Sequence, residues 1–144
     1  ALFSLSAVDE NKAQIGACGA IPPLVELLRD GNTRGKKDAA SALFNLCIYP
    51  PANRSRSVRA GLVPVLLEFM SSPAEAMGDE SLAILTILSG HEEGAKAIGD
   101  AGALPLLMEY IKAEGCPRNR ENAVIILSAL CSNDPRYLKE VKNS

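Results

Sequence analysis

Apolar and polar positions along this chain follow the spacing of a helix, and one helical phrase returns at intervals of about forty residues. Within that phrase, Ala39, Leu43 and Leu46 lie three and four positions apart, which marks one apolar face of a helix. The leucine that closes the phrase recurs in steps of 41, 42 and 42 residues, at Leu5, Leu46, Leu88 and Leu130. The pattern predicts one long helix per repeat, with this leucine in the core.

A second phrase recurs with the same period between copies of the first. It combines a glycine with apolar residues and a proline, in steps of 42 and 41 residues, at 19–22, 61–64 and 102–105. Helical units with a period in the low forties are typical of armadillo and HEAT solenoids. Such units cannot bury their apolar faces alone, so they stack. The fold class predicted is an all-α, right-handed superhelix of about three complete repeats.

Each complete repeat is predicted to contain three helices. The predicted ranges are 11–17, 20–29 and 36–48, then 53–60, 62–70 and 75–89, then 94–101, 103–112 and 118–131. The recurring glycines, Gly19, Gly61 and Gly102, suit a steep turn between helices, because a side chain there would block either the close approach or the backbone angles.

The whole chain, 1–144, is expected to form a single array. Its parts are the end of a truncated repeat (1–6), three repeats (7–48, 49–90 and 91–131) and the start of a further one (132–144). Because the sequence begins and ends inside repeats, we expect it to be a piece of a longer solenoid.

Composition excludes several classes of partner. The 15 basic and 17 acidic residues give a net charge of −2, so bulk attraction to nucleic acid or to an anionic membrane is not indicated. Neither a signal peptide nor an apolar stretch long enough for membrane insertion is present in the sequence. The sequence Asn53-Arg54-Ser55 matches a glycosylation acceptor, which we interpret as a chance match.

Metal, cofactor and catalytic chemistry are not predicted either. The four cysteines form no C-x-x-C pair, and His91 is the single histidine, so neither a zinc motif nor a catalytic triad can be assembled. Cys47 and Cys131 share one repeat position, which predicts a small buried side chain that fills space in the core rather than a reactive thiol. Unpaired cysteines fit a reducing compartment, the cytoplasm or the nucleus. Phosphate-binding loops and nucleophile elbows are also missing, so we expect no cofactor, no small-molecule substrate and no enzyme acting alone.

Several phrases resemble a known family. The stretch from Asn11 to Leu28 resembles the armadillo consensus. More specific phrases resemble the armadillo region of plant U-box E3 ubiquitin ligases, and they lie at 35–49, 58–61, 79–85 and 118–123. In that family the U-box recruits the ubiquitin-conjugating enzyme, and no U-box lies in these 144 residues.

The resemblance implies a module that binds a protein substrate or regulator, such as a kinase or another signalling protein, within a parent that is a ubiquitin ligase. The alternative is an armadillo adaptor unrelated to ubiquitin, acting in nuclear transport, in the cytoskeleton or as a signalling scaffold. A U-box upstream in the full-length sequence would separate the two.

The resemblance also implies where the partner binds. In armadillo proteins the third helices line a concave groove, and an asparagine there bonds a bound peptide backbone through its donor and acceptor. Asn45 stands at that position. Residues four apart on the three helices give the expected groove: Lys37, Ser41 and Asn45, then Asp79, Ala83 and Ile87, then Glu121, Ile125 and Ala129.

Nuclear import receptors hold a bound peptide with regularly spaced asparagine and tryptophan residues of the groove. This chain contains no tryptophan, so only Asn45 of that set is present. The groove is expected to become apolar toward the C-terminus, with acidic residues at its rim. Two alternatives stay open at this point. Ile87 and Ile125 could be ordinary core, or a one-residue shift could place Thr86 and Ser128 in the groove.

Overall fold

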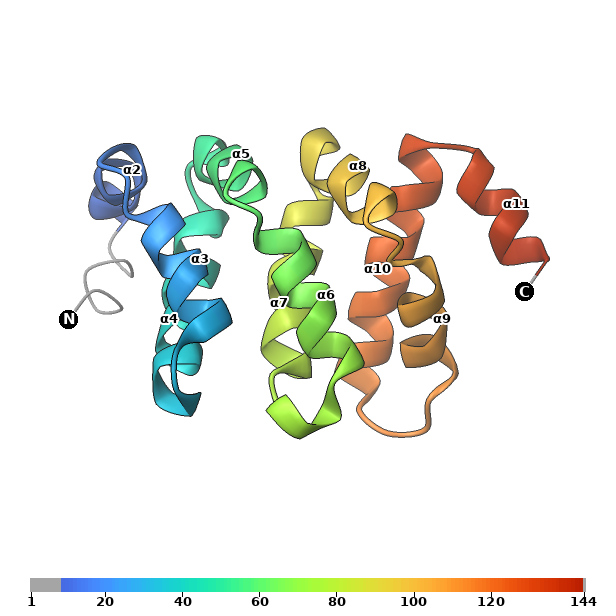
Figure 1. Cartoon of the computed structure of the whole chain (residues 1–144). Coiled ribbons are helices and arrows are strands. Elements are labelled where there is room, and N and C mark those ends of the chain that lie inside the picture. The colour runs from blue at the N-terminus through green and yellow to red at the C-terminus, as the bar shows by residue number, and fades with distance from the viewer. Residues whose placement is uncertain (1–8, 144) are drawn as a thin grey trace.

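The computed structural model describes residues 9–143 and forms a row of stacked helices (Figure 1). The described residues contain α-helices and one short 3-10 helix, and no strand. The helices are α2 (Asp9–Ala17), α3 (Ile21–Asp30), α4 (Thr33–Ile48), α5 (Pro51–Arg59), α6 (Leu62–Ser71), α7 (Gly78–Ser89), α8 (Glu92–Asp100), α9 (Leu104–Lys112), α10 (Pro117–Asn133) and α11 (Arg136–Lys142). The predicted all-α solenoid is confirmed. The segment expected at 1–6, with Leu5, lies outside the described residues.

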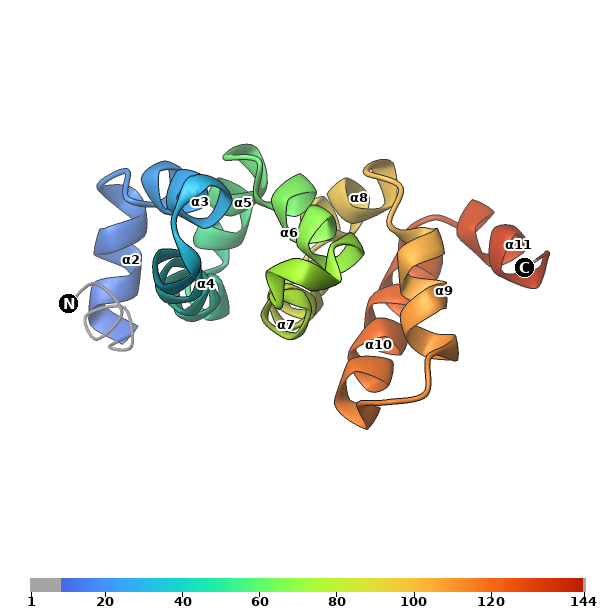
Figure 2. The same ribbon diagram turned by 60° about the horizontal axis from the view of Figure 1, so that its bottom comes forward.

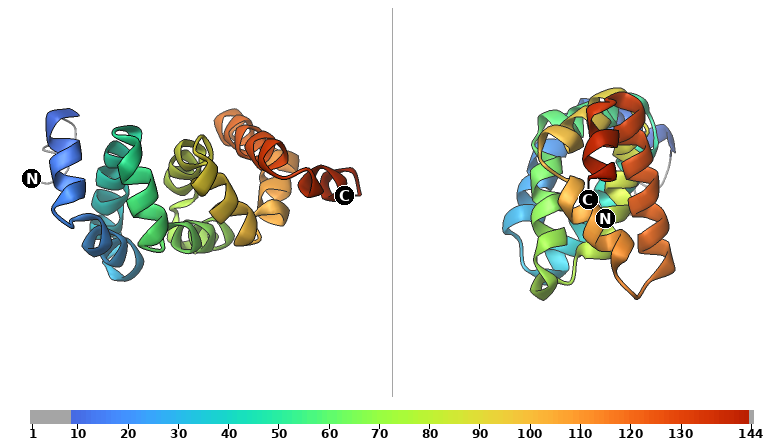
Figure 3. Two further views of the ribbon diagram at one scale, coloured as in Figure 1. Left: turned by 90° about the horizontal axis from the view of Figure 1, so that it is seen from above. Right: turned by 90° about the vertical axis from the view of Figure 1, so that its right-hand side faces the viewer.

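The helices fall into three sets that repeat along the row. The short first helices α2, α5 and α8 lie along one edge, and the second helices α3, α6 and α9 lie on one side of the third helices α4, α7 and α10 (Figures 1 and 2). Each second helix packs on its own third helix, while α4 packs on α7 and α7 on α10. Seen from above, the row is curved rather than straight (Figure 3). The third helices therefore form one continuous layer of the stack.

Two third helices begin three residues away from their predicted starts. The third helix of the first repeat was expected to begin at Lys36, but α4 begins at Thr33, after Asn32 as its N-cap. The third helix of the second repeat was expected to begin at Glu75, but α7 begins at Gly78. Pro73–Glu75 forms a 3-10 helix instead, and Ala76 follows it in the left-handed region with a φ of 52°. An α-helix cannot run through a left-handed residue, so this turn must close before α7 starts.

The recurring glycines are explained by their backbone angles. Gly19, Gly61 and Gly102 have φ values of 89°, 86° and 78°, in the region that favours glycine. A Cβ atom at any of the three would meet no atom within 4 Å. The requirement is therefore the left-handed turn between first and second helices, not a close approach of two helices.

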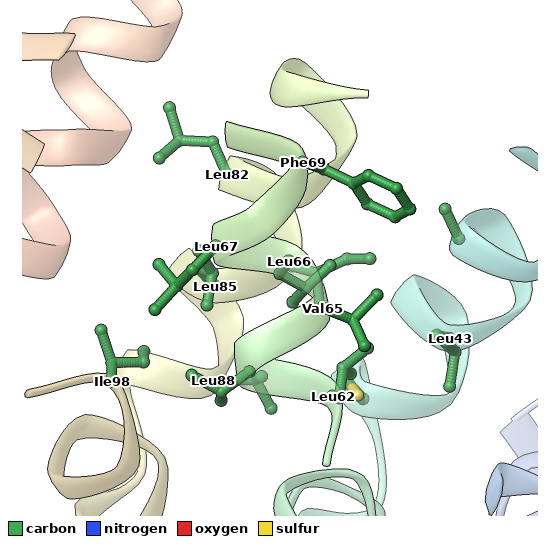
Figure 4. Packing of buried hydrophobic residues seen from close by; sticks show 14 of the residues in the cluster. Leu43, Leu62, Val65, Leu66, Leu67, Phe69, Leu82, Leu85, Leu88 and Ile98 are labelled. Atoms are coloured by element: carbon green, nitrogen blue, oxygen red, sulfur yellow. The ribbon is translucent and has the colours of Figure 1, made fainter. Parts of the chain in front are cut away.

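The recurring leucines form the centre of the core. Leu46, Leu88 and Leu130 are fully buried, as predicted. Figure 4 shows how the second repeat extends the core in both directions. Val65 and Phe69 of α6 point toward the preceding repeat, and Leu82 of α7 points toward the following one. The second repeat is thus covered by both of its neighbours.

A buried asparagine joins neighbouring repeats through their backbones. The Asn53 amide group donates hydrogen bonds to the carbonyl oxygens of Lys12 (2.9 Å) and Leu46 (3.0 Å). Gly16 leaves room for it, because a Cβ atom there would collide with Asn53 Oδ1. The Asn53 side chain is fully buried, which rules it out as a glycosylation acceptor in the folded chain.

We expect Leu88→Ala to lower the free energy of unfolding by about 2–5 kcal/mol, the usual cost of a large cavity in a core. Neighbouring repeats support one another, so this loss should destabilise the whole array. Urea denaturation followed by circular dichroism measures it. A loss below about 1 kcal/mol would contradict the burial of Leu88.

The Ser81 hydroxyl offers a second test of the core. Ser81 is fully buried, and its Oγ has no hydrogen-bond partner among the described residues. The same repeat position holds alanine in the other third helices, as buried Ala39 and Ala123. Ser81→Ala should therefore raise the free energy of unfolding by about 1 kcal/mol, because an unpaired buried hydroxyl is removed without changing the packing. A urea melt in which Ser81→Ala is less stable than the parent would show that the hydroxyl is paired.

Candidate protein-binding groove

The third helices α4 and α7 enclose a cleft of about 320 Å³ that opens on the surface of the stack. Four residues of α4 and three of α7 line it: Ala40, Ser41, Phe44, Asn45, Glu80, Ala83 and Ile84. The cleft exists because small residues meet there. Ala40 occupies the repeat position that holds Leu82 in α7 and Val124 in α10.

Three of the nine expected groove residues line this cleft. Ser41 and Asn45 come from α4, one helical turn apart, and Ala83 faces them from α7. Lys37 and Asp79 are exposed near the beginnings of the same helices and do not line the cleft. The structure therefore brings together the middle of the expected stripe and leaves its first positions at the rim.

The remaining expected residues lie on α7 and α10. Ile87 is partly buried and packs against the core, so it is partly the ordinary core residue that one alternative describes. Ile125 is 51% exposed, which is unusual for an isoleucine in a packed array. Glu121 is exposed, and Ala129 is partly exposed.

The one-residue shift would exchange these isoleucines for hydroxyl groups. The Thr86 hydroxyl is partly buried and donates to the Leu82 carbonyl oxygen at 2.8 Å, within its own helix. Ser128 is exposed. Thr86 thus has an intrahelical role in this structure.

Sequence reasoning missed four cleft residues: Ala40, Phe44, Ile84 and Glu80. Glu80 is the charged residue among them. It is only partly exposed, and its Oε2 atom is shielded from solvent without a hydrogen-bond partner in the described part of the chain. The repeat equivalents of Glu80 are Asp38 and Asn122, so the position resembles a solvated site in the first turns of a helix. The available signal was Ala40, whose small side chain opens space opposite Glu80.

Other charges around the third helices are paired between repeats. The Asn119 amide of α10 donates to Asp79 Oδ1 of α7 at 2.7 Å. Lys36 Nζ lies 2.8 Å from Glu75 Oε2 and 5.3 Å from the centre of the Phe69 ring. These contacts hold the beginnings of α4, α7 and α10 in register, and they occupy Asp79, which was expected to give the rim its acidity.

Reactive groups elsewhere are few. Over residues 9–143 no three His, Cys, Asp or Glu side chains are grouped so that they could hold a metal ion. His91 is the N-cap of α8, since its Nδ1 accepts a hydrogen bond from the Glu93 backbone N–H at 3.2 Å. None of the described helices has both the length and the apolar character needed to cross a membrane.

Cys47 is the buried filler that its repeat position predicted, whereas Cys131 at the equivalent position is partly exposed. Burial raises the pKa of the Cys47 thiol to about 11, and the Arg54 charge opposes that rise only in part. The Ser57 hydroxyl donates to the Asn53 carbonyl oxygen (2.8 Å), so the Cys47 thiol is the donor across its 3.3 Å contact with Ser57 Oγ. A protonated, buried thiol is a poor nucleophile.

Comparison with known proteins agrees with this geometry. The family model for the armadillo/beta-catenin-like repeat matches residues 9–48. U-box domain-containing protein 9 of Arabidopsis thaliana is 42% identical over 142 residues, 99% of this chain and 30% of that protein. U-box domain-containing protein 8 of the same plant is 36% identical over 142 residues, 98% of this chain and 37% of that protein. The chain therefore spans about a third of the length of these relatives.

Solved structures share the fold. One crystal structure of computationally designed armadillo repeat proteins for modular peptide recognition matches with a TM-score of 0.85. The match is 19% identical in sequence and covers 99% of this chain and 60% of that one. At this identity the likeness concerns the fold alone.

The state of Cys47 leads to a labelling prediction. Iodoacetamide at pH 8 should alkylate exposed Cys18 and Cys116 of the folded protein and leave Cys47 unmodified, because the pKa of Cys47 lies far above that pH and its sulfur is buried. Peptide mass spectrometry locates the label. Denaturation before labelling is the control and should expose all four cysteines. Alkylation of Cys47 at the rate of Cys18 in the native protein would contradict its burial.

Proposed function

Since this chain is an armadillo-repeat array whose homologues are plant U-box domain-containing proteins, we propose that it binds a protein substrate or regulator on behalf of a U-box E3 ubiquitin ligase. The bound protein is of the signalling type, such as a kinase, and the encounter takes place in the cytoplasm or the nucleus. The array itself contributes binding, and the U-box of the full-length protein contributes recruitment of the conjugating enzyme.

The observation that supports this proposal most directly is the cleft between α4 and α7. Stacked repeats present an extended surface of third helices, which suits an extended segment of a partner. Asn45 lines the cleft, and its amide has two donors and an acceptor with two lone pairs, enough to bond a peptide backbone beside any internal contact. The designed armadillo proteins that share this fold are described as made for modular peptide recognition, which supports the same use of the groove here.

Ile125 provides the apolar part of the proposed surface. It is half exposed on α10, and a large apolar side chain on a binding surface is a suitable anchor for an apolar side chain of the partner. Ile87, on the neighbouring helix, lies partly buried beside the core. The proposed groove thus runs from polar Ser41 and Asn45 on α4 to apolar Ile125 on α10.

We expect Asn45→Ala and Ile125→Asp each to weaken partner binding by about 1–2 kcal/mol, the size of one or two hydrogen bonds or one apolar anchor left unmade. The partner is first captured from plant extract on the immobilised array and identified, and purified partner is then titrated calorimetrically against each variant. Leu27→Asp is the matched control, because Leu27 is also an exposed apolar residue but lies on α3, outside the cleft. Equal affinity of all variants, with unchanged melting curves, would show that the groove is not the site.

The ubiquitin part of the proposal has its own test. The array is fused behind the U-box of U-box domain-containing protein 9 and mixed with activating enzyme, conjugating enzyme and the captured partner. Ubiquitin should appear on the partner, and the unfused array should give none. A partner that binds the groove but is never modified by the fusion would favour the adaptor without a link to ubiquitin.

A further inference from the structure

A hollow of about 370 Å³ lies on the edge of the array formed by the first helices, away from the cleft between α4 and α7 (Figure 1). Its walls come from the end of α2, the turn into α3 and the last turn of α5. Two arginines line it together with residues that are apolar or glycine: Arg56 and Arg59, with Gly16, Ala17, Gly19, Ile21, Pro22 and Ala60. The hollow therefore combines two positive charges with an apolar wall.

The repeat architecture makes this hollow, but it does not require the arginines. The same five repeat positions that line it from α2 and α3 line a second hollow of about 490 Å³ two repeats further along, between α8, the start of α9 and α11. There Asp100 stands in the place of Ala17, and α11 contributes Arg136 and Glu140. The second hollow thus has two carboxylates and one guanidinium, so of the two the first is the one that attracts an anion.

The arginines of α5 do more than stabilise their own helix. Basic side chains in the last turn interact favourably with the helix dipole, yet the last turns of α2 and α8 contain none. Arg56 Nη1 donates a hydrogen bond to Asn53 Oδ1 at 2.9 Å. Arg59 Nε lies 3.6 Å from Glu93 Oε1, and 74% of the Arg59 side chain is exposed. Because a guanidinium has five N–H donors, both arginines keep donors for a ligand.

The charge beside the hollow matches one carboxylate. Arg56 and Arg59 contribute two positive charges and Glu93 one negative charge, which leaves a single positive charge. A carboxylate neutralises that charge and accepts two hydrogen bonds from one guanidinium, whereas a phosphate monoester, at about −1.5 to −2, would leave an excess of negative charge.

The apolar wall beside the arginines fits an aliphatic side chain close to that carboxylate. Ala17 and Pro22 are exposed and Ala60 is partly exposed, so these three side chains are open to contact. In a protein, the C-terminal residue is the one that has a carboxylate and an apolar side chain on the same carbon atom. The volume, about 370 Å³, holds one such residue with part of the next.

We propose that this hollow binds the C-terminal residue of a partner protein, with its carboxylate on Arg56 and Arg59 and its aliphatic side chain against Ala17, Pro22 and Ala60. The inference goes beyond the proposed use of the groove, because it assigns a second surface of the array to a chain end of defined chemistry.

Fluorescence anisotropy with peptides labelled at the N-terminus tests the inference. The probes are decapeptides of serine and glycine that end in leucine, prepared either as the free acid or as the C-terminal amide. The free acid should bind at least about 10-fold more tightly than the amide, the effect of one charge-assisted hydrogen bond. A third peptide, with glutamate and leucine inside the chain and an amide end, should bind like the amide. Acid and amide peptides that bind alike would overturn the inference, as would an internal glutamate that binds as well as the free end.

Charge variants locate the site. Arg59→Gln should weaken the free-acid peptide about 10-fold and leave the amide unchanged, whereas Arg136→Gln, which removes the same charge from the second hollow, should change affinity less than about 2-fold. Ala17→Asp copies Asp100 of the second hollow and should weaken the free acid at least as much. Glu93→Gln should tighten binding, because it removes a competing carboxylate. Thermal melts check that the variants remain folded, and equal effects of Arg59→Gln and Arg136→Gln would overturn the site.

Cys18 reports occupancy of the hollow independently. It is exposed and lies between Ala17 and Gly19, which both line the hollow. Saturating free-acid peptide should slow the alkylation of Cys18 by iodoacetamide several-fold and leave the alkylation of exposed Cys116, in another repeat, unchanged. Equal slowing of both cysteines, or of neither, would overturn the placement.

Asn45→Ala separates this site from the groove. The free-acid peptide should bind that variant as tightly as the parent, because Asn45 lines the cleft between α4 and α7 and not the hollow. If Asn45→Ala weakens the peptide and Arg59→Gln does not, the peptide binds in the groove, the hollow is wrong as a site and the proposed function stands.

Discussion

The structure depends on one constraint: the part of a third helix's apolar surface that its own second helix leaves uncovered can be buried only by neighbouring repeats. α7 shows the constraint fully, since it packs on α4 on one side and on α10 on the other. Its residues Leu82, Leu85 and Leu88 are completely buried as a result. Val124 of α10, at the repeat position of Leu82, is 44% exposed because no third helix packs on the outer side of α10 in the described part of the chain. Burial at this position is therefore a property of the stack and not of the single helix.

Polar contacts then fix how the repeats sit on one another. Apolar packing alone is not directional, whereas hydrogen bonds require defined geometry. Asn53 bonds backbone carbonyl groups of α2 and α4 from α5, and Asn119 bonds Asp79 between α10 and α7. Gly16 makes the Asn53 contact possible, because the absence of a side chain at Gly16 leaves the space that the Asn53 side chain fills. These contacts hold the third helices in a layer whose outer positions are free to vary without loss of the fold.

That freedom is where the candidate site arises. The repeat position filled by Leu82 in α7 holds alanine in α4, and the smaller side chain opens the cleft between the two helices. The cost is modest in a long array, because each repeat is still supported by two neighbours. Glu80 also lines the opened space, and its Oε2 atom is shielded from solvent without a hydrogen-bond partner among residues 9–143, the kind of local conflict that folded proteins retain chiefly at functional sites. A regular stack and an irregular groove are therefore compatible in one sequence.

The sequence by itself determined the architecture, because period, helical spacing and turn residues are local signals repeated several times. The phrase ending in Leu46, Leu88 and Leu130 predicted three buried core positions, and the glycines at 19, 61 and 102 predicted the turns that their positive φ values explain. The same register placed Ser41, Asn45 and Ala83 on the groove face, and these three do line the cleft. Repetition made these inferences possible, since each was supported by equivalent residues elsewhere in the chain.

Only the tertiary structure decided which equivalent positions become different. Asp38 and Glu80 hold equivalent repeat positions, yet Glu80 lines the cleft against the preceding third helix α4, whereas Asp38 is exposed and no third helix precedes α4 in the described part of the chain. Ile87 and Ile125 hold different repeat positions but were both expected to face the groove, yet Ile87 packs against the core and Ile125 is half exposed. The late start of α7 had no clear local signal, since the left-handed Ala76 is not a glycine. Local patterns specify the helices and their core faces, whereas the space between two helices is set by side chains about forty residues apart, which no local pattern records.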